Sequence, residues 1–143
     1  MGVQSLLGEL DGPAVRRWCR AALDLMGRAR EEIDALNVYP VPDGDTGTNL
    51  FLTLESGTDA VDALFARDDV PGPDLPTAFR ALAHGALMGA RGNSGVILSQ
   101  LLRGMAERLE VEQAAAQAAG HELPAGLALA RALATASDAA YAA

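Results

Sequence analysis

The sequence contains no lysine, one cysteine and few aromatic residues, and each shortage excludes a class of function. All eleven basic residues in the 143-residue chain are arginine. Without lysine the chain can form neither a P-loop phosphate site nor a Schiff base. Cys19 stands alone, so an internal disulfide and a cysteine-based zinc site are both excluded. We expect Cys19 to be a small residue of the core.

The charge balance is acidic and argues against nucleic acid as a partner. The formal net charge is −8, and the arginines form no basic cluster. Such a chain binds polyanions poorly. No apolar run is long enough to cross a bilayer, and the N-terminus lacks the basic and apolar regions of a signal peptide. We therefore expect a cytoplasmic protein without a membrane span.

The composition favours helices over strands. Hydrophobic residues make up 50% of the chain, alanine dominates among them, and only 4% of residues are aromatic. Strands are enriched in β-branched and aromatic residues, whereas alanine is the best helix former. No useful stretch alternates apolar and polar residues. The sequence predicts a single all-α domain over residues 1–143.

Apolar spacing and turn residues place five helices along the chain. We expect helices at about 13–36, from 46–48 onward, at about 76–89, through 96–109 and from about 125 onward. The first helix carries an apolar stripe of Val15, Trp18, Ala22, Leu25, Ala29, Ile33 and Leu36. In the second, Leu50, Phe51 and Leu54 should point inward and Gly57 should be a weak point. Residues 68–76 and 111–124 read as connections, the latter with an alanine-rich part that favours a helix.

Two glycine-rich loops each lead directly into an apolar helix. They are "PDGDTGTN" at 42–49 and "GARGNSG" at 89–95. A helix start carries unpaired N–H groups and partial positive charge, and it therefore attracts phosphate. Glycines let the backbone approach a ligand closely. The simpler alternative is that Asn93 or Ser94 is an ordinary N-cap.

Asp43 and Asp45 distinguish the first loop. Paired carboxylates beside a helix start suit Mg²⁺, which takes oxygen ligands and often shares nucleotide phosphates. An EF-hand calcium loop would need an oxygen side chain, a glycine and a glutamate at its fifth, sixth and twelfth positions. This loop has Gly47, Thr48 and Leu54 there. The calcium interpretation is excluded.

Residues 36–50, "LNVYPVPDGDTGTNL", and 85–104, "GALMGARGNSGVILSQLLRG", resemble the nucleotide-binding domain of bacterial fatty acid kinases. That domain is related to the ATP-binding subunit of dihydroxyacetone kinases. The resemblance implies an antiparallel barrel of eight α-helices that holds ATP and Mg²⁺ at its open end. It also implies that a complete domain continues beyond this sequence, so that residues 1–143 are expected to be its N-terminal portion, truncated at the C-terminus.

The resemblance also implies roles for individual residues. Asp43 and Asp45 would be the catalytic metal ligands, with Thr48 a further magnesium ligand and Asn37 a support for the loop. The remaining nucleotide-binding positions would be Thr46, Gly47 and Asn49 in the first loop, and Arg91, Gly92, Asn93, Ser94 and Gly95 in the second. Arg91 has an equally simple interpretation as a solvated loop residue.

The resemblance suggests an acceptor as well. Dihydroxyacetone-type subunits carry a further aspartate and a histidine at positions that are Val38 and Thr46 here. This departure favours the fatty acid branch, in which phosphate passes to a fatty acid carboxylate held by a separate fatty acid-binding protein of the DegV type. The alternatives are a dihydroxyacetone kinase subunit and a non-catalytic nucleotide-binding module. A homodimer is compatible with each. A portion of a barrel should leave apolar side chains uncovered, namely Val15, Trp18, Leu25, Val96, Ile97 and Leu101.

Overall fold

The computed structural model of the chain describes residues 10–36, 44–67 and 72–142. These segments contain α2 (Gly12–Leu36), α3 (Thr46–Phe65), α4 (Leu75–Met88), α5 (Gly92–Ala119) and α6 (Ala125–Tyr141), with no strand among the described residues. The prediction of an all-α fold is confirmed. The expected bounds of the first and third helices and the expected start of the last helix agree with the structure to within about one residue.

Short acidic side chains fix where two of the helices begin. The backbone N–H of Ala14 donates to Asp11 Oδ1 at 2.8 Å at the start of α2. The N–H of Thr77 donates in the same way to Asp74 Oδ1 at 2.9 Å, and Pro76 occupies the first turn of α4. Each carboxylate satisfies an N–H group that has no partner within its helix.

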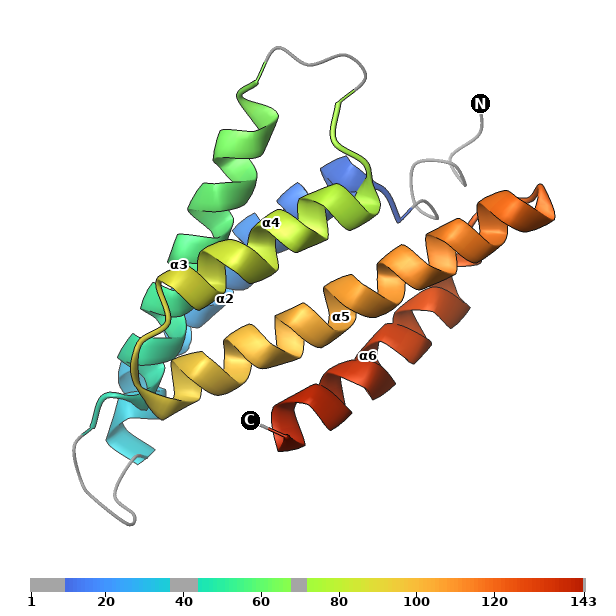
Figure 1. Ribbon diagram of the computed structural model, residues 1–143. Coiled ribbons are helices and arrows are strands. Elements are labelled where there is room, and N and C mark those ends of the chain that lie inside the picture. The colour runs from blue at the N-terminus through green and yellow to red at the C-terminus, as the bar shows by residue number, and fades with distance from the viewer. Residues whose placement is uncertain (1–9, 37–43, 68–71, 143) are drawn as a thin grey trace.

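Successive helices pack against one another, and α3 also contacts α5 while α2 also contacts α4. Figure 1 shows that the last turns of α2 and α4 and the first turns of α3 and α5 gather at one end of the molecule. The helix α6 runs back along α5. This topology brings both glycine-rich segments to the same end.

The core is built from leucines and small residues. Leu75, Leu82, Leu102, Leu109 and Val61 are among its largest fully buried side chains. Gly57 is part of this packing, and α3 continues through it without a break. A Cβ atom at Gly57 would lie 2.8 Å from Leu82 Cδ1 and 2.9 Å from the Leu82 carbonyl oxygen. Glycine is needed here because α3 and α4 approach so closely.

The apolar stripe expected on α2 is only partly buried. Val15 and Cys19 are buried, whereas Trp18, Leu25 and Leu36 are 48%, 64% and 74% exposed. The stripe is wider than the surface that α3 and α4 cover, so residues at its edge and near its end reach solvent. Trp18 still stacks on Phe79 of α4, with ring centroids 6.4 Å apart.

The structure also corrects the extent of α5. This helix continues to Ala119, so residues 111–119 are helical and the connection to α6 is short. Gly120 ends the helix in a left-handed conformation, with φ +73°, and the N–H of His121 donates to the carbonyl of Ala116 at 3.1 Å. A glycine that closes the last turn in this way is a common helix stop.

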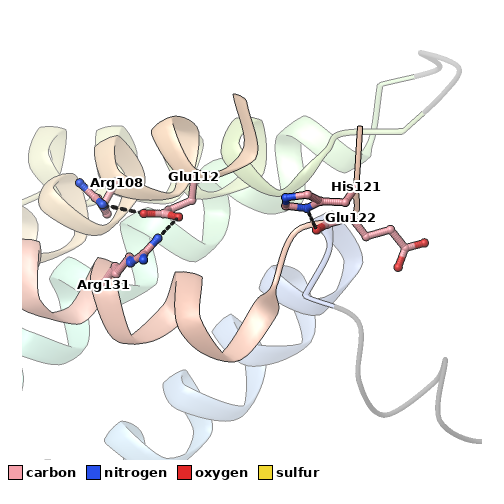
Figure 2. Close-up of polar contacts among 5 residues, drawn as sticks. All are labelled: Arg108, Glu112, His121, Glu122 and Arg131. Carbon is pink, nitrogen blue, oxygen red and sulfur yellow. Dashed lines mark hydrogen bonds and ion pairs between the residues drawn. The ribbon is translucent and has the colours of Figure 1, made fainter. Parts of the chain in front are cut away.

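An ion triad holds α6 against α5. Glu112 of α5 is buried and accepts hydrogen bonds from Arg108 Nε, one turn earlier on α5, and from Arg131 Nη1 of α6, both at 2.9 Å. Figure 2 shows the two guanidinium groups converging on this carboxylate, and His121 near Glu122 in the following turn. His121 Nδ1 lies 2.8 Å from the Glu122 carbonyl oxygen.

Several large apolar side chains remain exposed along α5 and α6. Val96 and Ile97 are 43% and 48% exposed, and Leu133 is 52% exposed. Val15 was expected among the uncovered residues but is buried, because α2 turns it toward the core. Across the described segments, no helix combines the length and the apolar character that crossing a bilayer requires.

Candidate functional site

The starts of α3 and α5 are joined by one side chain. Thr53, in the second turn of α3, donates its hydroxyl hydrogen to the carbonyl of Asn49 at 2.7 Å. The same oxygen accepts the backbone N–H of Arg91 at 3.0 Å. The residue just before α5 is therefore tied directly to α3. The two glycine-rich segments that the sequence separates by some forty residues form one site region.

Glycines make this close approach possible. Gly92 has a φ of +65°, and a Cβ atom there would lie 2.5 Å from Asn49 Nδ2. Gly95 is buried, and a Cβ atom there would collide with the Thr53 hydroxyl. Gly92 is thus required for its backbone conformation and for its contact with Asn49. Gly95 is required for helix contact.

Among the described residues, no side chain caps the backbone N–H groups at the start of α5. Arg91 is the N-cap residue, and its side chain makes no capping hydrogen bond. The alternative that Asn93 or Ser94 is an ordinary N-cap is therefore wrong, because both residues lie inside the first turn. Arg91, Gly92 and Asn93 are exposed and Ser94 is half-buried. The helix start is open to an anionic ligand.

The first glycine-rich loop, residues 42–49, is described only from Gly44 onward. Asp43 and Asn37 lie outside the described residues, so their predicted roles have no structural account. Asp45 is the N-cap residue of α3, is exposed, and makes no side-chain capping hydrogen bond. Within the described segments, no three histidine, cysteine, aspartate or glutamate side chains gather closely enough to hold a metal ion. The Asp45 carboxylate is thus exposed at the start of α3, and it makes no capping bond to the residues that the structure describes.

Thr48 is held by two residues of α2. Its backbone N–H donates to Asp34 Oδ1 at 3.0 Å and its hydroxyl to Asp34 Oδ2 at 2.7 Å. Arg30 Nε donates to the Thr48 hydroxyl oxygen at 3.0 Å, and its guanidinium lies 5.1 Å from the centre of the Phe51 ring. The end of α2 thus fixes the first turn of α3.

Sequence reasoning missed Asp34. Hydrogen bonds from the Thr48 side chain hold the pKa of this carboxyl below its usual range, with further help from the N–H groups of Thr48 and Gly47 and the charge of Arg30. Asp34 therefore serves the first turn of α3 as a capping carboxylate supplied by another helix. Its position in the last turn of α2 was visible in the sequence, but the contact with Thr48 was not.

The first turn of α3 lies directly on α2. Gly47 is buried, and a Cβ atom there would collide with the carbonyl oxygen of Arg30. Gly44 has a φ of +64°, a conformation that favours glycine. Thr46 and Asn49 are half-buried beside this contact. The glycines of the first loop allow the loop to turn and α3 to seat on α2.

Comparison with known proteins identifies this region as part of a family. Residues 40–143 match the model of the DAK2 domain, which is the nucleotide-binding domain of dihydroxyacetone kinase-like proteins. The match includes both glycine-rich segments.

Curated bacterial relatives cover the same part of the chain. Protein YloV of Bacillus subtilis is 43% identical over 104 residues, which are 73% of this chain and 18% of YloV. An uncharacterised protein of Staphylococcus saprophyticus is 41% identical over 105 residues, again 73% of this chain and 18% of the relative. An uncharacterised Staphylococcus aureus protein is 50% identical over 80 residues, 56% of this chain and 14% of the relative. The chain thus spans less than a fifth of the length of these relatives.

Proposed function

This chain belongs to the DAK2 domain family, and from that premise we propose that it binds ATP and Mg²⁺ at the linked starts of α3 and α5. The observation that carries the proposal is the Thr53 link, which sets the uncapped start of α5 beside the loop that contains Asp45. Helix starts of this kind bind phosphate through their N–H groups. The nucleotide would then serve a kinase reaction.

The phosphate groups are assigned mainly to the start of α5. Gly92, Asn93 and Ser94 offer backbone N–H groups there, and Asn93 adds an exposed side chain. At the start of α3 the N–H of Thr48 is already taken by Asp34. Thr46 and Asn49 remain at the edge of the site, and Arg91 is an exposed cation at the start of α5.

The residues present fit a magnesium ion. The proposed donors are the carboxylate of Asp45, the hydroxyl oxygen of Thr48 and the carboxylate of Asp43, which lies two residues before Asp45 in the sequence; all would be hard oxygen ligands. One or two carboxylates completed by phosphate oxygens are a usual magnesium set. In phosphoryl transfer the ion neutralises the charge of the phosphates. The chain has no lysine for that task.

Within this proposal the acceptor is a fatty acid carboxylate presented by a DegV-like fatty acid-binding protein, which would yield an acyl phosphate. A carboxylate is already ionised at neutral pH, so the chain needs no general base. The support is the sequence resemblance, with Val38 and Thr46 in place of the residues of dihydroxyacetone-type subunits. Dihydroxyacetone is therefore the second candidate acceptor.

Calorimetric titration of the 143-residue chain with ATP, with and without Mg²⁺, tests nucleotide binding. Asp45→Asn should weaken Mg·ATP binding and leave metal-free ATP binding little changed, because it removes only a metal ligand. Asp138→Asn, an exposed aspartate on α6, is the matched control. Equal affinities for Asp45→Asn and the control would contradict the metal assignment. A chain that binds no ATP would contradict the proposal itself.

A second assay separates the possible acceptors. A full-length protein containing this domain would be given labelled ATP with oleate and a DegV-like protein, or with dihydroxyacetone. The proposal expects labelled acyl phosphate in the first reaction alone. Product from dihydroxyacetone would establish the alternative acceptor, and ATP binding without turnover in either reaction would favour a non-catalytic module.

A further inference from the structure

Asp34 and Arg30 determine the direction of the hydrogen bonds that the Thr48 hydroxyl makes. A hydroxyl has one hydrogen to donate and two lone pairs to accept with. Ionised Asp34 can only accept, so the 2.7 Å contact uses the Thr48 hydrogen. Arg30 Nε can only donate, so its 3.0 Å contact uses one lone pair. Counting its partners among the described residues, the hydroxyl keeps a single lone pair.

The remaining lone pair determines which ligands the Thr48 hydroxyl can bind. Phosphate oxygens accept hydrogen bonds, and Thr48 has no hydrogen left to donate to them. A cation needs an electron pair, and one is available. We propose that Asp34 is a positioning residue. It holds the hydrogen of the Thr48 hydroxyl, so that the hydroxyl oxygen can bind the metal ion but the hydroxyl cannot donate to a phosphate. The inference rests on the proposed nucleotide site.

Asp34 is well placed for this task because both of its oxygens are used by Thr48. Oδ1 takes the backbone N–H and Oδ2 takes the hydroxyl. The residue therefore fixes the position of Thr48 and the direction of its hydroxyl at once. A simple helix cap would need only the first contact.

Asp34→Asn should reverse the direction of the hydrogen bond between residue 34 and the Thr48 hydroxyl, while the side chain keeps almost the same shape. If the oxygen of the new amide keeps the N–H of Thr48, the NH₂ group of that amide faces the hydroxyl, which must then accept. With Arg30 donating as well, both lone pairs are used and the hydrogen is released toward other acceptors. The variant keeps the cap and loses the electron pair offered to the metal.

The test is a set of titrations of the 143-residue chain with Mg·ATP and with ATP in EDTA. We expect Asp34→Asn and Thr48→Val each to weaken Mg·ATP binding by about tenfold, the scale of one lost charge-assisted contact. Binding of metal-free ATP should change much less in both. Circular dichroism melts identify the folded samples. Should Asp34→Asn fail to fold, Thr48→Val carries the test, and unchanged Mg·ATP affinity there would overturn the proposal.

Removing Arg30 supplies a readout that a purely structural role would not move. In an Arg30→Met background one lone pair of the Thr48 hydroxyl stays free even when the amide introduced by Asp34→Asn donates to it. Asp34→Asn should therefore cost clearly less Mg·ATP affinity in that background than in the wild-type chain. An equal cost in both backgrounds would overturn the role of Asp34. A wild-type chain that binds no ATP would instead overturn the proposed function, and this inference with it.

Discussion

Glu112 of α5 and Arg131 of α6 meet in a hydrogen bond of 2.9 Å, and the carboxylate is almost completely buried. Burial alone would raise the pKa of Glu112. Hydrogen bonds and charge from Arg131 and Arg108 outweigh it and hold the pKa below the ordinary value of 4.5. The charged carboxylate is therefore the form that joins the two helices.

The first prediction is a pH dependence of stability that Glu112 supplies. A carboxyl whose pKa is lowered by folding stabilises the protein above its unfolded pKa, and this contribution is lost as pH falls through the folded pKa. Thermal melts should show stability decreasing below about pH 4.5. Glu112→Gln should lower the melting temperature by several degrees at pH 7 and flatten this acid-side decrease, because the uncharged amide leaves two arginines without a carboxylate.

Glu107→Gln is the control for that experiment. Glu107 also pairs with an arginine on α5, at 2.7 Å, but its side chain is 60% exposed. An exposed pair contributes little, so its melting temperature should barely change. Equal shifts for the two variants would contradict a special role for Glu112.

A second prediction concerns the crossing of α3 and α4. A Cβ atom at Gly85 would lie 2.5 Å from Ala60 Cβ and 2.8 Å from the Ser56 carbonyl oxygen. Gly85→Ala should therefore destabilise the fold by about 1–3 kcal/mol, the cost of overpacking. At Gly126 of α6 nothing lies within 4 Å. Gly126→Ala should stabilise by about 0.4–1 kcal/mol. Chemical denaturation measures both, and the same sign at both positions would contradict this packing.

A third prediction concerns the thiol of Cys19. Burial raises its pKa to about 11, with the Thr58 hydroxyl acting in the opposite direction and the charge of Asp62 in the same one. The thiol is fully buried and protonated at neutral pH, and thiols react as thiolates. A thiol reagent at pH 7.5 should label the native chain only at the rate of unfolding, and the denatured chain quickly. Rapid labelling of the folded protein would contradict the buried position.

The features that could be predicted from the sequence are those that short stretches of residues determine, namely helices and loops. Apolar spacing and turn residues predicted the five helices, and the glycine and aspartate patterns predicted the two loops that lead into α3 and α5. The end of α5 was expected near residue 109 but lies at Ala119. Gly120, directly after the alanine-rich run, is a common helix-stop residue and could have indicated this end. Glu112 and Asp34 were missed for a different reason. Their partners, Arg131 and Thr48, lie 19 and 14 residues away on other helices, and neither pair has a local spacing that reveals it. The link through Thr53 was hidden in the same way.

The last prediction is self-association of the 143-residue chain through its uncovered apolar surface. A cavity of about 400 Å³ is lined by side chains of α2, α4, α5 and α6, including Trp18 and Leu133. Leu133 also lines a neighbouring apolar hollow of about 420 Å³ with Ile97 and Tyr141. Apolar side chains that lie exposed next to one another promote association.

Leu133→Gln should therefore shift the chain toward the monomer in sedimentation velocity experiments, because Leu133 belongs to both hollows and is 52% exposed. Val111→Gln is the matched control, since Val111 is 56% exposed on α5 and lines neither hollow. Both substitutions remove similar exposed apolar area, so only the position differs. A wild-type chain that remains monomeric at high micromolar concentration would contradict the prediction. Equal shifts in the two variants would show that general surface hydrophobicity, rather than this surface, causes the association.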